Sequence, residues 1–354
     1  MPIVSRSDLV PFILAFSLGL LAAGLCVWLA TPLPWMIGPL LATAIGRMAG
    51  VDLHAPLAVR SAGQWAIGTA LGLYFTPPVV QVLASYIGFI ALGIVFAMGL
   101  GLFCGWLLQR MTGIDRTTAF FAMAIGGAAE MAAQGERHGA RVDRVAAAHS
   151  LRIMMVVLII PFAFKFSGVH GLDAYQPGAR IVSYPGLALL IAATSAMAWL
   201  FRRRDLPNAW VIGPLLVSIG LTATNINLSA LPEWMVHLGQ LFIGISLGSR
   251  FSREFLHTAP RYLGCVALCS TVAMLLAFGF GLALSALSGI HPATAILATS
   301  PGGIAEMSLT AKTLELGVPI VTAFHVMRMA VLVMTIGPLF NLMRRWQAAR
   351  AGAS

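Results

Sequence analysis

The sequence is short of charge, and above all of acidic charge. Only 10% of its 354 residues are Asp, Glu, Lys or Arg, and 12 acidic residues stand against 22 basic ones. Soluble domains carry about 25% charged residues, so this chain cannot cover the surface of a water-soluble fold of its size. The deficit excludes an ordinary cytosolic enzyme, a nucleic-acid-binding domain and a disordered chain.

Cysteines and cofactor motifs are scarce as well. The four cysteines, Cys26, Cys104, Cys265 and Cys269, lie within apolar stretches, and none has the C-x-x-C spacing of a metal or redox site. The chain has no Walker A sequence, no H-E-x-x-H helix and no strand-linked dinucleotide fingerprint. We therefore expect no cofactor, no metal, no catalytic residue and no nucleic-acid partner.

Hydrophobic residues make up 59% of the chain, and they form twelve long apolar stretches. In the first half these are 9–30, 34–50, 62–76, 80–108, 117–135 and 145–167, and in the second half 183–201, 209–224, 234–249, 262–287, 293–311 and 318–342. A transmembrane helix needs about 20 apolar residues, and most stretches reach that length with tilt and flanking residues. The pattern predicts an all-α polytopic membrane protein with the lipid bilayer as partner.

The chain is an internal duplication. PWMIGPLL at 34–41 returns as AWVIGPLL at 209–216, and GGAAEM at 126–131 returns as GGIAEM at 302–307. Between them, QWAIGTALGLYF starting at Gln64 matches QLFIGISLGSRF starting at Gln240. The blocks keep their order, and such repeats decide an architecture. We divide the chain into a first membrane repeat, 1–175, and a second, 176–354.

The fifth stretch of each half carries a Gly-Gly pair followed by a glutamate, which interrupts a helix at membrane depth. If this stretch dips into the bilayer and returns, each half has five spans and the two halves are inverted. The cytoplasmic positions then hold 17 Arg residues and the outer positions only 3 Arg or Lys, as the positive-inside rule demands. We predict ten spans, two re-entrant segments and both termini cytoplasmic. A broken crossing helix, with one short neighbour failing to cross, is the alternative.

Paired titratable residues mark the candidate substrate site. The predicted site residues are Gly126, Gly127, Glu130, His149 and Arg152, with Gly302, Gly303, Glu306, His325 and Arg328 in the second half. The glutamates are either functional groups or members of structural ion pairs. The arginines either neutralise those glutamates or bind a substrate carboxylate. The histidines are either satisfied buried side chains or proton-coupling groups.

Inverted repeats with interrupted helices are typical of secondary transporters. A helix break also exposes backbone N–H groups and a helix N-terminus, both of which attract anions. We therefore expect a secondary transporter of a small, anionic metabolite or ion. A membrane sensor that transports nothing is the alternative, and the two differ in whether any solute crosses the membrane.

The duplicated W-x-I-G-P-L-L and G-G-x-A-E-M blocks resemble the AbrB-type membrane protein family of bacteria, over essentially the whole chain. The resemblance implies the bacterial inner membrane, and it is compatible with a homo-oligomer. Members have been labelled ammonia monooxygenases or regulators of gene expression. Metal oxygen chemistry needs clustered ligands, and the arginines beside the candidate ligands would repel a cation, so we expect no enzyme. The repeats are also similar to cation–proton antiporters and anion transporters, whose re-entrant Gly-Gly motifs form the substrate site.

Overall fold

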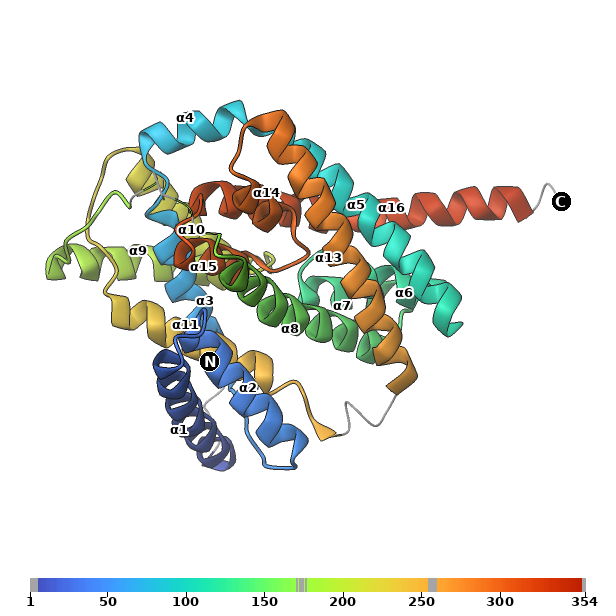
Figure 1. Cartoon of the computed structure of the whole chain (residues 1–354), viewed down its shortest axis with the longest axis horizontal. Helices are drawn as coiled ribbons and strands as arrows, with labels where there is room; N and C mark the ends of the chain where they lie inside the picture. Colours follow the sequence, from blue (N-terminus) through green and yellow to red (C-terminus); the bar gives the residue numbers. More distant parts are fainter. Residues whose placement is uncertain (1–5, 170, 172–174, 176, 254–259, 352–354) are drawn as a thin grey trace.

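The structure, a computed structural model, describes residues 6–169, 171, 175, 177–253 and 260–351, and every regular element among them is an α-helix (Figure 1). The first half contains α1 (Arg6–Trp28), α2 (Pro34–Met48), α3 (Leu57–Gly72), α4 (Pro77–Ser85), α5 (Ile87–Thr112), α6 (Arg116–Met123), α7 (Ala128–Arg137) and α8 (Val142–Ser167). The second half contains α9 (Tyr184–Arg203), α10 (Ala209–Ala223), α11 (Glu233–Gly248), α13 (Pro260–Ser288), α14 (Pro292–Thr299), α15 (Ile304–Thr313) and α16 (Val318–Ala351).

The helix lengths recur with the sequence repeat. Helices α2 and α10 both have 15 residues, and α3 and α11 both have 16. The short helices also match, with 8 residues in α6 and α14 and 10 in α7 and α15. The positions that would match α4 are 253–261, and residues 254–259 of that stretch lie outside the described residues, as do both chain termini.

Six described helices, namely α1, α5, α8, α9, α13 and α16, are long and apolar enough to cross a membrane. The chain is therefore a multi-pass membrane protein by length and composition. The other four predicted spans form α2, α3, α10 and α11, which have 15 or 16 residues. A helix of that length is roughly 24 Å long, short of a hydrocarbon core of about 30 Å, so the count of ten spans stays a prediction.

The predicted span over 80–108 begins differently in the structure. A separate helix, α4, covers Pro77–Ser85, and the long helix α5 starts only at Ile87. Helix α4 is bent by 88° from α3. The start of a separate helix at Pro77 has a local cause. Pro77 and Pro78 occupy the first turn of α4, where their missing N–H groups cost nothing.

The helices form two bundles that draw equally on both halves of the chain. In the first bundle α1, α2 and α3 pack with α9, α10 and α11. In the second bundle α5 to α8 pack with α13 to α16, and α5 lies beside α13 (Figure 1). The packing is exchanged between halves, since α2 contacts α11 while α3 contacts α10, and α5 contacts α16 while α13 contacts α8.

Glycines permit the close approach inside the first bundle. A Cβ atom on Gly68 of α3 would collide with the carbonyl oxygen of Val211 in α10. The equivalent Gly244 of α11 lies in the same way against the carbonyl oxygen of Met36 in α2. The duplicated I-G blocks of the sequence are therefore helix–helix contacts, and small residues allow the backbones to come this close.

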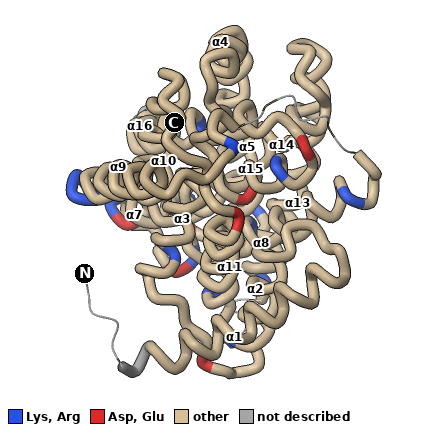
Figure 2. The backbone as a smooth tube through the Cα atoms, turned by 90° about the vertical axis from the view of Figure 1, so that its left-hand side faces the viewer, with Lys and Arg blue, Asp and Glu red and all other residues tan. Residues whose placement is uncertain are grey.

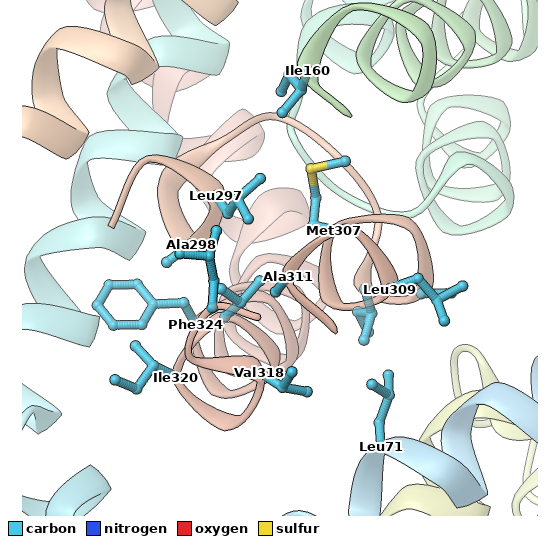
Figure 3. Packing of buried hydrophobic residues seen from close by; sticks show 14 of the residues in the cluster. Leu71, Ile160, Leu297, Ala298, Met307, Leu309, Ala311, Val318, Ile320 and Phe324 are labelled. Atoms are coloured by element: carbon cyan, nitrogen blue, oxygen red, sulfur yellow. The ribbon is translucent and has the colours of Figure 1, made fainter. Parts of the chain in front are cut away.

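The second bundle has an apolar core around α14, α15 and α16. Figure 3 shows Leu297, Met307, Ala311 and Phe324 from these three helices gathered around one another. Charged residues are few, and Figure 2 shows them as isolated blue and red segments with long tan stretches between them. Buried charged residues are therefore rare in this chain, and those that occur lie beside the helix breaks.

Candidate functional site

Both predicted helix interruptions are present at the Gly-Gly pairs. Helix α6 ends at Met123 and α7 begins at Ala128, while α14 ends at Thr299 and α15 begins at Ile304. At Gly126 a Cβ atom would lie only 3.0 Å from the sulfur of Met131. The Met131 side chain, in the first turn of α7, therefore packs directly against Gly126 in the break.

In the first half, α8 holds the carbonyl end of α6. His149 Nε2 lies 2.9 Å from the carbonyl oxygen of Phe121. Arg152 Nη1 donates to the carbonyl oxygens of Met123 at 3.3 Å and Ala124 at 3.1 Å. A cation is favourable here because the last carbonyls of a helix carry its negative dipole end.

The second half repeats this arrangement. His325 Nε2 lies 2.9 Å from the carbonyl oxygen of Leu297. Arg328 donates to the carbonyl oxygens of Ser300 at 2.7 Å and Gly302 at 2.6 Å. Each His and Arg pair thus caps a broken helix and orients the chain that enters the gap.

The hydrogen bonds define the tautomer and the protonation state of both histidines. Arg152 Nη2 lies 3.0 Å from His149 Nδ1, and Arg328 Nη2 lies 2.9 Å from His325 Nδ1. A guanidinium can only donate and a carbonyl can only accept. Each ring must therefore accept at Nδ1 and donate from Nε2, which is a neutral imidazole. Of the two roles considered for these residues, the geometry favours the satisfied buried histidine.

Both arginines keep an unused donor. Arg152 is 2% exposed and Arg328 is 7% exposed, and the Nε atom of each has no hydrogen-bond partner among the residues that the structure describes. Among the described residues neither guanidinium forms an ion pair with Glu130 or Glu306. Of the two roles considered for these arginines, the ion pair with a glutamate is not formed among the described residues, and the binding of a substrate carboxylate stays a prediction.

The two glutamates lie at the N-termini of α7 and α15. The Glu130 carboxylate folds back over Gly127, and its Oε1 accepts a hydrogen bond from the backbone N–H of Asn208 at 3.1 Å. The Glu306 carboxylate folds back over Gly303 in the same way. A carboxylate in the first turn balances the positive end of the helix, so each glutamate stabilises the helix that carries it.

One cavity of about 100 Å³ contains both breaks and lies between the two bundles. All the predicted site residues line it except His149, which sits behind Arg152. The duplication therefore brings equivalent residues from the two halves to a single place. Among the described residues, no group of three or more His, Cys, Asp or Glu side chains is placed to hold a metal ion.

The first bundle contributes a wall of the cavity that was not predicted from the sequence. This wall includes Arg60, Gln64, Asn208, Ser246 and Arg250. Arg60 and Arg250 lie near enough to Glu306 to interact with it electrostatically. Gln64 and Arg250 belong to the duplicated blocks that begin at Gln64 and Gln240, and that was the only signal that could have marked them.

A groove of about 350 Å³ adjoins the cavity on the α7 side. Alanines of α7 and α8 line it, among them Ala132 and Ala146, together with Asp143. Arg250 lines both the groove and the cavity, and its Nη1 donates to Ser150 Oγ at 3.3 Å. The groove therefore ends at the cavity wall that Arg250 forms.

The equivalent path in the second half is filled. Ser308 and Thr322 match Ala132 and Ala146 of the groove, and both are fully buried and joined by a hydrogen bond of 2.9 Å. Helix α15 packs against α3, with Leu71 of α3 in the same apolar cluster as Leu309 (Figure 3). The two halves share one fold but differ in how their broken helices are covered.

Comparisons with known proteins agree with the sequence blocks. The family described as "Transition state regulatory protein AbrB" matches residues 35–344. "Putative regulator AbrB" of Escherichia coli (strain K12) is 26% identical over 344 residues, which cover 96% of each chain. "Uncharacterized protein YhjN" of Bacillus subtilis (strain 168) is 26% identical over 300 residues, covering 79% of this chain and 77% of that protein. The family match spans both repeats and both Gly-Gly breaks, so this chain belongs to the AbrB family and the predicted resemblance is confirmed.

Proposed function

We propose that this protein is a secondary transporter of a small anionic metabolite. The observation that carries the proposal is the single cavity in which both broken helices meet four arginines and two glutamates. Non-helical backbone at membrane depth is tolerated where it is enclosed by protein or lines a water-filled cavity. Broken helices around a central polar cavity are the arrangement by which transporters bind a solute within the bilayer.

The two bundles supply the parts that would move. The cavity has one wall from the first bundle, with Arg60 and Arg250, and another from the second, with the breaks and the buried arginines. A displacement of one bundle along the other would expose the cavity first to one side of the membrane and then to the other. This alternation needs no change within either bundle.

The exchanged helix contacts support inverted repeats. In two copies related by a twofold axis, each contact occurs twice. If one helix of the first copy contacts a different helix of the second copy, then the equivalent of each helix makes the same contact in the other direction. The pairs α2–α11 and α3–α10 follow this rule, as do α5–α16 and α13–α8. Combined with the 17-to-3 charge asymmetry of the sequence, the contacts favour an axis in the membrane plane.

Two hydrogen bonds support the re-entrant form of the fifth segments. The backbone N–H of Arg141, just before α8, donates to Thr118 Oγ1 at 2.8 Å. Helix α6 therefore starts near the beginning of α8, and α7 ends there because only four residues join α7 to α8. The second half has the equivalent bond from Gly317 N to Thr294 Oγ1 at 3.2 Å. Each fifth segment therefore enters the protein as far as the buried arginine of its half and returns to the side from which it entered.

The unequal covering of the broken helices supports a state open on one side. The groove reaches the cavity along α7, whereas Ser308 and Thr322 are buried on the α15 side. With the N-terminus inside, the open side is the cytoplasmic one. The opposite state would bury Ala132 and Ala146 and expose their second-half equivalents.

The proposal is tested with purified protein in liposomes. Uptake of a panel of organic acids, amino acids and ammonium is measured for the wild type, for Glu130→Gln and Glu306→Gln, and for Gly99→Ala. Gly99 has open space around its Cβ position, so its variant controls for purification and insertion. We expect anion uptake by the wild type and the control, and its loss in both glutamate variants.

The same assay separates transport from sensing. Absence of flux for every solute, from protein that still unfolds cooperatively on heating, would contradict the proposal and favour a membrane sensor. Uptake of ammonium alone, unaffected by either glutamate variant, would contradict the anionic substrate.

A further inference from the structure

The cavity has a surplus of positive charge. Its charged lining residues are Arg60, Arg152, Arg250 and Arg328, opposed by Glu130 and Glu306. Arginine keeps its charge at every relevant pH. His325, the one histidine of the lining, is held neutral by its hydrogen bonds. With both carboxylates ionised, the described residues of the lining carry two more positive than negative charges.

The surplus is concentrated on the two buried arginines. The glutamates already lie at the N-termini of α7 and α15, so the positive ends of those helices are balanced. Arg152 and Arg328 have no carboxylate within ion-pair distance among the described residues. The carbonyls at the helix ends carry only partial negative charge, so each guanidinium keeps net positive charge that a bound anion could balance.

Each buried arginine also has donors to offer. Three hydrogen bonds use three of the five N–H groups of Arg152, and the Nε–H is among the remaining two. Arg328 likewise makes three hydrogen bonds and keeps its Nε–H unpartnered. The two arginines are equivalent in the repeats, and therefore present two matched anchor points to one cavity.

We propose that the cavity binds a small dicarboxylate, with one carboxylate directed to Arg152 and the other to Arg328. This inference rests on the proposed function, because it names the substrate class of the transport site. Two separate guanidinium groups at matched positions fit a ligand with an anionic group at each end. Both guanidinium groups line one cavity of about 100 Å³, so a single small ligand can reach both of them.

Binding is measured by calorimetry on the purified protein in detergent, so that the result does not depend on flux. The probes are succinate and butyrate, which share a four-carbon chain but differ in charge, together with inorganic phosphate and sulfate. We expect succinate to bind at least tenfold more tightly than butyrate, and more tightly than either inorganic anion. Equal binding of succinate and butyrate, or tighter binding of sulfate, would overturn the dicarboxylate assignment.

The charge count is tested without disturbing the buried hydrogen bonds. Arg60→Gln removes one positive charge from the lining, and should lower the preference for succinate over butyrate by about tenfold. Arg110→Gln removes an exposed arginine that lies outside the cavity, over Trp106, and should leave the preference unchanged. An unchanged preference in Arg60→Gln, or an equal loss in both variants, would contradict the assignment.

Flux measurements keep the two proposals distinguishable. Uptake of butyrate without uptake of succinate would leave transport standing and overturn the dicarboxylate assignment. Succinate binding that is sensitive to Arg60→Gln, with no flux of any solute, would overturn transport and leave the binding site in place.

Discussion

Gly63 of α3 and Gly239 of α11 occupy equivalent positions in the two halves, and each lies against the backbone carbonyl oxygen of the other. A Cβ atom on Gly63 would lie 2.7 Å from the Gly239 oxygen, and one on Gly239 would lie 3.2 Å from the Gly63 oxygen. A residue that contacts its own equivalent lies on a twofold axis. The crossing of α3 and α11 is therefore the point about which the first bundle is built.

Gly63→Ala should destabilise the protein by about 1–3 kcal/mol, because the added methyl group enters an already close backbone contact. Thermal unfolding of the purified protein in detergent measures the effect. Gly99→Ala makes the same change in a helix position with open space around it, and should leave the midpoint unchanged or raise it. A midpoint for Gly63→Ala equal to that of the control would contradict the contact.

Glu130→Ala should lower stability by about 1–2 kcal/mol, whereas Glu130→Gln should not. The alanine leaves the Asn208 N–H without its acceptor, and burying an unpaired donor is costly. The glutamine keeps a side-chain oxygen that can accept the same bond. The unfolding midpoints of the two variants give the comparison, and equal midpoints would show that this hydrogen bond does not form.

Single cysteines at matched positions should differ in their reactivity. On a cysteine-free background, Ala132→Cys and Ala146→Cys face the groove and should react with a membrane-impermeant maleimide from the cytoplasmic side. Their equivalents, Ser308→Cys and Thr322→Cys, lie at fully buried positions and should remain unlabelled.

The sidedness of that labelling has its own control at Ala140, in the charged loop before α8. Ala140→Cys should be labelled only from the cytoplasmic side, as the arginine distribution requires. Labelling of position 140 only from outside would contradict the inverted repeats. Equal reactivity at positions 132 and 308 would contradict the one-sided opening.

His149→Phe and His325→Phe should each destabilise the protein by about 1–3 kcal/mol. Each change removes the imidazole donor from a buried carbonyl, of Phe121 or Leu297, and leaves an arginine N–H without its acceptor. The Leu297 oxygen keeps a bond from Ser300 Oγ at 2.8 Å, so the shared cost is the unpaired arginine donor. His54→Phe, at an exposed position, is the control. The unfolding midpoint is the measurement, and a loss of stability in only one of the two variants would contradict their equivalence.

Much of the site was predictable because its residues occur twice in the sequence, once in each half. The Gly-Gly pairs, Glu130 and Arg152 each recur in the second half at nearly constant spacing, and a Gly-Gly pair interrupts a helix for local reasons. The roles of the arginines were not predictable. Whether a guanidinium meets a carboxylate or a backbone carbonyl depends on where the broken helix ends, and that depends on packing between helices distant in sequence.

The sequence by itself determined the membrane environment, the duplication and the positions of the helix breaks. These follow from composition, self-similarity and local backbone preference, which need no partner in space. Only the tertiary structure decided that the first three helices of each half form one bundle, that α5 to α8 and α13 to α16 form another, and that the cavity lies between the two bundles. Only it could place Arg60 and Arg250 beside Glu306, or bury Ser308 while leaving Ala132 beside a groove. These outcomes depend on contacts between residues far apart in the chain, and such contacts let two equivalent sequence segments pack differently.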